Sequence, residues 1–255
     1  MTPLRHHNSS RPLDRVSLGI WRRSARGSQL IELEARELSR LLPDVFGRHV
    51  LQVGSWAADA ALVDSAGTMH HAVLGGLGDP AAAGVVDPQQ LPLAAKSVDA
   101  IVLPHTLEFS RSPHNVLREV DRVLNDRGRL FVLGFNPWSL WSWRAALGLR
   151  HRAFPSGARF YSAGRVSDWL ELLDFEVGEV RRFSVGFPWL APHSVGDGWS
   201  PASLLAPFAE AYLVCARKRV LPMNFVGRVA RAQVRPLVGV GVPVAQRESD
   251  SSLTP

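Results

Sequence analysis

Short, continuously apolar stretches alternate with helical patterns along most of this chain, and that alternation restricts the possible folds more than any other feature. The clearest stretch is Val98–Pro104, in which Asp99 is followed by Ala-Ile-Val-Leu without a polar interruption. The next segment, Pro113–Leu124, places its apolar residues on one helical face. Other stretches of the strand type are His49–Val53, Met69–Leu74, Gly84–Val86, Arg129–Phe135, Phe175–Phe183 and Glu210–Ala216.

Strands that are apolar along their whole length belong to a sheet covered on both faces, and helices between them favour parallel pairing. Ala57–Ala66 and Ser162–Leu173 have helical patterns, and Asn125–Gly128 has the composition of a turn. The last two strands are joined by the proline- and glycine-rich segment 186–208, which favours antiparallel pairing. We therefore predict an α/β fold: a Rossmann-like, seven-stranded, mostly parallel sheet with helices on both faces and an antiparallel last strand.

The chain divides by composition into three parts. Residues 1–27 are polar and basic and predict a flexible lead-in, and residues 221–255 predict a basic, mostly disordered tail. Residues 28–220 form the predicted domain. Within it we expect an N-terminal helix in 28–47, capped by Ser28, and an aromatic-rich lid insertion at 136–161.

Charge and cysteine content narrow the expected environment and partners. The net charge is +6, but neither a helix-turn-helix nor an RNA-binding sheet signature is present, so nucleic acid is not an expected partner. The single cysteine, Cys215, excludes an intrachain disulfide and predicts a buried, inert thiol in a cytoplasmic protein. No apolar run reaches the roughly 18 residues that span a bilayer. No metal site is expected, because His105 and His114 lack a fixed set of acidic partners.

Four strand ends carry the residue types of a binding site. In open α/β sheets, ligands bind beyond the carboxyl ends of the strands, so segments that follow different strands should meet at one edge. These segments are Gln52–Trp56, Asp87-Pro88, Leu103–His105 and Asn136–Trp138.

Three segments resemble the "type 11" domain of class I S-adenosylmethionine-dependent methyltransferases: Val50–Gly54, Asp87–Leu93 and Ser97–Gly134. Gly134–Trp141 is similar to an uncharacterised bacterial branch of that family. The resemblance implies S-adenosylmethionine as the cofactor and His105 as the residue nearest the chemistry, either as a base or in positioning the acceptor. It implies that the cofactor binds to Gln52, Gly54, Ser55, Trp56, Asp87, Pro88, Leu103 and Pro104. The aromatic-rich segments predict substrate contacts at Asn136, Trp138, Trp141 and Tyr161.

The sequence departs from the family pattern near the first glycine. Gln52 stands where the family usually has an acid, and Trp56 where it has a second glycine; the ribose-binding acid after the second strand is also missing. Our leading hypothesis is methyl transfer to a small apolar or aromatic molecule. Two alternatives stay open: a catalytically silent relative that binds a partner through the lid or tail, and an RNA or DNA methyltransferase. The sequence does not determine the oligomeric state.

Overall fold

The computed structural model describes residues 21–54, 56, 62–76, 82–139, 142, 158–185, 193–195 and 207–219. All of them belong to the first of two units, Met1–Val220 and Leu221–Pro255. The predicted tail, most of the predicted lid and half of the predicted helix Ala57–Ala66 lie outside the described residues. The described half, residues 62–66, forms a turn and not a helix, so the predicted helix is wrong there.

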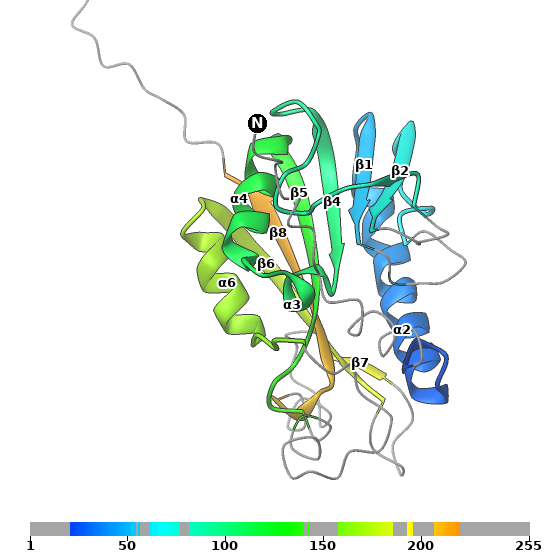
Figure 1. The fold of residues 1–255 in the computed structure, drawn as a ribbon. Helices are drawn as coiled ribbons and strands as arrows, with labels where there is room; N and C mark the ends of the chain where they lie inside the picture. The colour runs from blue at the N-terminus through cyan, green and yellow to red at the C-terminus, as the bar shows by residue number, and fades with distance from the viewer. Residues whose placement is uncertain are drawn as a thin grey trace, which may run out of the picture. The chain divides into compact units, whose positions relative to one another are not determined.

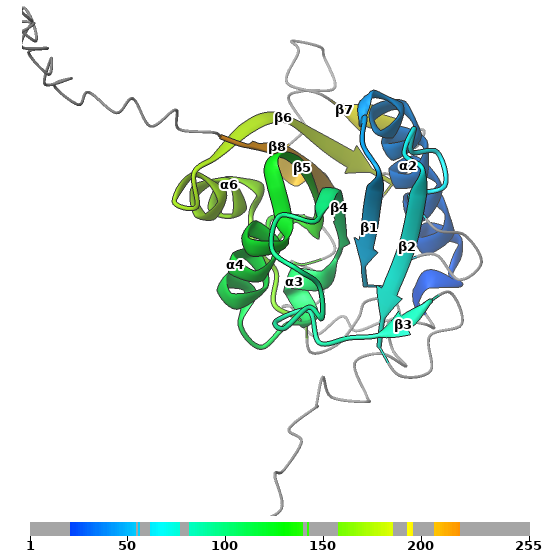
Figure 2. The same ribbon diagram turned by 90° about the horizontal axis from the view of Figure 1, so that it is seen from above.

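Eight strands form one sheet in this part of the chain, in the order β3-β2-β1-β4-β5-β8-β6-β7 (Figures 1 and 2). The first five in this order are parallel to one another, whereas β8 is antiparallel to both of its neighbours. The strands are β1 (His49–Val53), β2 (His70–Gly75), β3 (Gly84–Val85), β4 (Val98–Pro104), β5 (Leu124–Phe135), β6 (Phe175–Ser184), β7 (His193–Val195) and β8 (Ala211–Lys218). The predicted fold class is confirmed, with the short edge strand β7 in addition.

Helices cover both faces of the sheet, as Figure 2 shows: α4 and α6 lie on one side and α2 on the other. The helices are α2 (Ala25–Leu41), the 3-10 turn η1 (Leu42–Asp44), α3 (Thr106–Phe109), α4 (Pro113–Val123) and α6 (Ala163–Glu171). Side chains alternate between the two faces along each strand. In β4, for example, Ala100 and Val102 pack on the α2 side, and Ile101 and Leu103 on the α4 side.

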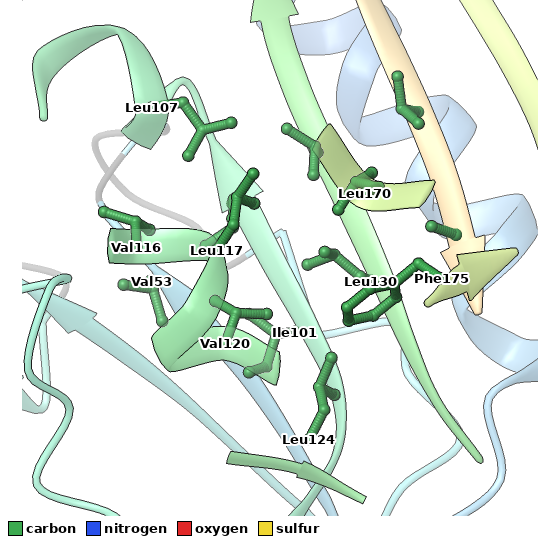
Figure 3. Packing of buried hydrophobic residues seen from close by; sticks show 14 of the residues in the cluster. Val53, Ile101, Leu107, Val116, Leu117, Val120, Leu124, Leu130, Leu170 and Phe175 are labelled. Carbon is green, nitrogen blue, oxygen red and sulfur yellow. The ribbon is translucent and has the colours of Figure 1, made fainter. Parts of the chain in front are cut away.

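Buried apolar side chains form the layer on the α4 side of the sheet (Figure 3). Val116, Leu117 and Val120 recur at the three- and four-residue spacing of a helix face and are fully buried against the sheet. Each such side chain contributes about 1.5–3 kcal/mol relative to its exposed state. This layer fixes β4 and β5, and therefore fixes where their carboxyl ends lie.

The N-terminal boundaries differ from the prediction. Helix α2 begins at Ala25 with Ser24 as its cap, because Ser24 Oγ accepts a hydrogen bond from the Gly27 backbone N–H at 3.1 Å. Trp21 is buried, so the predicted lead-in ends at least seven residues too late and Trp21–Gly27 belong to the fold.

The predicted turn Asn125–Gly128 is instead part of β5. Its register against β4 shifts there, from Val98 opposite Leu124 to Ala100 opposite Arg129, so the extra residues form a bulge. Within the bulge, the Asn125 side chain accepts a hydrogen bond from the Arg127 backbone N–H at 3.0 Å. Asparagine often makes this bond in turns, which explains why the composition indicated a turn here.

Candidate functional site

The strand order reverses between β1 and β4. From β1 the chain continues outward to β2 and β3, and then returns to place β4 on the other side of β1. Parallel strands on both sides of this point end at the same edge, which is the usual location of a ligand site in open α/β sheets. Val53 ends β1 and Pro104 ends β4, so the segments that follow them meet here.

The turn after β1 is held by contacts within the protein. Gln52 is buried; its amide N–H donates to Gly54 O at 2.9 Å, and its amide oxygen accepts from the Leu62 N–H at 2.9 Å. Gly54 has a φ of +103°, and a Cβ there would lie 2.5 Å from Thr106 Oγ1. That hydroxyl donates to Val53 O at 2.5 Å. The glycine is therefore required by the close approach of Thr106, whatever ligand binds nearby.

His105 follows β4 directly and is buried in the left-handed backbone conformation, with a φ of 51°. Its Nε2 lies 3.0 Å from Glu34 Oε1, and its Nδ1 lies 3.3 Å from Glu108 Oε1. Burial by itself acts to lower the pKa of His105, but the charge of Glu34, the hydrogen bonds to both carboxylates and the charge of Glu108 outweigh burial and raise that pKa to about 9. The imidazole is therefore protonated at neutral pH and donates from both nitrogens.

That protonation state bears on the predicted role of His105. An imidazolium cannot accept a proton, so the raised pKa favours the positioning role predicted for His105 over the role of a base; both roles stay predictions. The second oxygen of Glu108 is buried without a hydrogen-bond partner among the described residues, while the first also accepts the Phe135 N–H at 2.6 Å. No cluster of three or more metal-ligating side chains occurs in the described ranges.

Trp56 is fully buried against these groups. The centroid of its ring lies 3.8 Å from that of His105, 5.7 Å from Phe135 and 5.6 Å from Trp21. The indole N–H donates to the second carboxylate oxygen of Glu34. Trp56 therefore fills the space between the ends of β1, β4 and β5.

Asp87 lies at the rim of a separate hollow, and Pro88, which follows it, is not among the residues that line that hollow. Asp87 is exposed, and its Oδ1 accepts the Gln89 N–H at 2.9 Å in a local turn. The hollow has a volume of about 440 Å³ and is polar. It is lined by Asp87, Gln89, Gln90, Asn115, Arg118, Glu119 and Arg122.

Leu103 and Pro104 are the last two residues of β4, and both are buried. Leu103 packs into the apolar layer on the α4 side. The Pro104 carbonyl accepts from Thr106 Oγ1 at 3.3 Å, so this peptide is held next to the turn after β1.

Of the predicted substrate residues, Asn136 and Trp138 follow the end of β5 and Tyr161 precedes α6. Trp141, like the predicted cofactor residue Ser55, lies outside the described residues. Asn136 is largely buried, and its amide donates to the carbonyls of Pro207 and Ala209 at 2.7 and 2.9 Å. It therefore joins β5 to the segment before β8. Trp138 is 60% exposed, whereas Tyr161 packs edge-on against Trp169, with ring centroids 4.9 Å apart.

The prediction missed Glu34, Glu108 and Trp21. A signal for Glu34 was present, because it lies four residues from both Leu30 and Leu38 on the buried stripe of α2. A carboxylate in the middle of an apolar helix face is rarely buried without a partner. Its partner His105 lies 71 residues away in the sequence, which no local pattern reveals.

The strand order, the switch between β1 and β4 and the helical layers together define a class I methyltransferase fold. The family described as "Methyltransferase domain" matches residues 47–132. The uncharacterised protein YafS of Escherichia coli (strain K12) is 35% identical over 189 residues, which cover 74% of this chain and 76% of YafS.

Solved structures agree on the fold. A methyltransferase from Thermotoga maritima, described as a possible histamine N-methyltransferase, has a TM-score of 0.56 and is 19% identical in sequence. The matched region covers 81% of this chain and 98% of the Thermotoga chain. A methyltransferase from Archaeoglobus fulgidus has a TM-score of 0.57 and is 17% identical in sequence. The matched region covers 78% of this chain and 99% of the Archaeoglobus chain. The chain belongs to the S-adenosylmethionine-dependent methyltransferases of the type 11 domain family, and S-adenosylmethionine is the cofactor.

The residues at the β1–β4 junction do not fit this cofactor in the conformation described. The amide of Gln52 is already bonded at both ends, and the space next to Gly54 is taken by Thr106. Trp56 and His105 are in ring contact, which leaves no gap between the two strand ends. Asp87 lines an open polar hollow that shares none of its lining residues with this junction.

Within the described ranges, none of the helices combines the length and the apolar character that crossing a bilayer requires.

Proposed function

We propose that this chain transfers a methyl group from S-adenosylmethionine to a small apolar or aromatic acceptor, at the sheet edge between β1 and β4. The observation that carries the proposal is the buried triad of Glu34, His105 and Glu108 at that edge. Burying three ionisable groups costs several kcal/mol unless each is well paired, so such a group is a poor choice for stability alone. Its location at the switch point supports a role in the site.

A second observation supports the acceptor class. Trp138 is 60% exposed just beyond the end of β5, on the same side of the sheet edge. An exposed indole gives an apolar or planar molecule a flat surface for stacking. The acceptor class and the cytoplasmic location both stay predictions from the sequence.

Calorimetric titration with S-adenosylhomocysteine tests cofactor binding. We expect the wild type to bind, and Asp87→Ala to bind roughly tenfold more weakly, because a hydrogen bond to a charged group contributes about 1.5 kcal/mol or more. The matched control is Asp126→Ala, which removes an exposed aspartate paired with Lys96 at the other end of β4 and should leave binding unchanged. Absence of binding at millimolar ligand, both to the wild type and to a variant that lacks the Trp56 indole, would refute the proposal.

Transfer of labelled methyl groups into a host extract tests the acceptor. Label in the low-mass fraction is expected. Label in the RNA or DNA fraction would instead support nucleic-acid methylation, for which no described feature of the fold argues.

The second candidate is a catalytically silent relative that binds a partner protein. It is favoured by the position of Trp56, whose buried indole fills the junction where a cofactor would have to enter. Full absence of ligand binding in both the wild type and a variant that lacks this indole would favour this candidate over the enzyme.

A further inference from the structure

Trp56 and His105 lie too close together for any ligand to pass between them. Carbon atoms in contact are about 3.5–4.0 Å apart, so a ligand between two rings would need a separation near 7 Å. The two ring centroids are 3.8 Å apart at an interplanar angle of 33°. The described conformation is therefore a closed one.

The indole is held in this position from the N-terminal helix. One carboxylate oxygen of Glu34 accepts the Trp56 N–H, and the other accepts from His105 Nε2 at 3.0 Å. Glu34 thus bridges the two rings, and it sits on a helix whose Leu30 and Leu38 anchor it in the core. Glu34 therefore connects the residue after β4 to the segment after β1 from the helix.

Two further aromatic rings, those of Trp21 and Phe135, pack around Trp56. Trp21 packs at a centroid distance of 5.6 Å, and Phe135 packs edge-on against Trp21 at 5.4 Å. All three rings are buried, so the junction is filled by side chains from four separate segments. A ligand that enters between β1 and β4 has to displace at least one ring. Trp56 and Phe135 both contact His105, with ring centroids 3.8 and 4.1 Å away. Phe135 is fixed in β5, whereas Trp56 belongs to no strand or helix, so Trp56 is the ring that can move.

We propose that Trp56 is a displaceable plug: with its N–H held by Glu34, it occupies the cofactor site, and S-adenosylmethionine binds only when the indole moves off His105. This inference rests on the proposed function. Because only the open fraction of molecules binds, the apparent Kd equals the intrinsic Kd divided by that fraction. A plug that is closed in nine molecules of ten or more therefore weakens binding at least about tenfold.

The test is calorimetric titration of the full chain with S-adenosylhomocysteine. We expect Trp56→Ala to bind at least about tenfold more tightly than the wild type. Trp56→Phe keeps a ring but loses the N–H donor to Glu34, and should bind on the order of a few-fold more tightly. Trp169→Phe, a buried tryptophan of α6 on the other face of the sheet, is the matched control and should leave the affinity unchanged.

Fluorescence gives a readout that does not depend on activity. Protonated histidine quenches a stacked indole, so ligand binding to the wild type should raise emission as Trp56 leaves His105, and the rise should be missing in Trp56→Phe. If Trp56→Ala does not fold, as judged by its circular dichroism, Trp56→Phe decides the question by affinity and emission together.

The outcomes separate the plug from the proposed function. Equal affinities for the wild type and Trp56→Ala, or weaker binding by the variant, would overturn the plug and leave the methyltransferase proposal standing. No binding to the wild type with clear binding to Trp56→Ala would support the plug in its strongest form. No binding to either protein would overturn both.

Discussion

Raising the pH above neutrality should destabilise this protein through His105. Its pKa is about 9 in the folded protein, against an ordinary value of 6.5, so the folded state holds a proton that the unfolded state releases first. The stabilisation is then fully present below pH 6.5, declines from there upward, and is lost as the pH passes through about 9. At about 1.4 kcal/mol per pH unit, the difference amounts to roughly 3 kcal/mol.

The charged groups that face His105 determine the pH range over which stability changes. Glu34 comes from α2 and Glu108 from α3, and both carboxylates attract the imidazolium. The hydroxyl of Tyr212 also lies near Glu108. Burial, and then the charge of Glu108, raise the pKa of Tyr212 well above its usual range, so this hydroxyl stays neutral between pH 6.5 and 9. The pH dependence between 6.5 and 9 is therefore assigned to the imidazolium.

Urea unfolding followed by far-ultraviolet circular dichroism at pH 6, 7.5 and 9.5 measures the effect. We expect the wild type to lose about 3 kcal/mol of unfolding free energy relative to His105→Gln across this range. Glu34→Gln should reduce that loss, because it removes the largest charge that acts on His105. If the wild type and His105→Gln lose stability in parallel, the buried imidazolium does not exist and the description of the triad is wrong.

Three other substitutions or modifications test the surroundings of the site. Gly54→Ala should cost roughly 2 kcal/mol or more, because its φ is +103° and the new Cβ would meet Thr106, as measured by urea unfolding. Asn136→Ala should cost roughly 2 kcal/mol through two lost hydrogen bonds to backbone carbonyls, measured in the same way. Cys215 should react with iodoacetamide at pH 8 at least about 100-fold more slowly in the native protein than in urea, because burial raises its pKa to about 12.

Each of these expectations has a result that contradicts it. Gly164 in α6 is the control for Gly54, since an added Cβ there meets nothing within 4 Å, and Gly164→Ala should be neutral or slightly stabilising. Equal effects of the two glycine substitutions would remove the argument for the tight turn. An Asn136→Ala variant as stable as the wild type, or a Cys215 thiol that reacts equally fast in both states, would contradict the packing described for β5 and β8.

The fold could be predicted from sequence because its signals are local. Val98–Pro104 has the predicted bounds of β4, and α4 ends one residue before the predicted end. An uninterrupted apolar stretch next to a helix with one apolar face has few ways to bury both. The three-residue strand β7 was not predicted, since its sequence, His-Ser-Val, has no apolar run and lies in a segment rich in proline and glycine.

The site was predictable in its position but not in its arrangement. Gln52, Gly54 and His105 were expected at one edge, and the structure brings them together there. What the sequence could not show is that Glu34 crosses from α2 to bridge Trp56 and His105, because that contact joins segments with no common pattern. The roles predicted for these residues toward a cofactor stay predictions.

A crystal structure of the full chain with S-adenosylhomocysteine tests the central claim most directly. The account predicts the ligand at the sheet edge between β1 and β4, with the Trp56 indole moved away from His105 and Asp87 on the adenine. A ligand bound at another surface while Trp56 still stacks on His105 would contradict it.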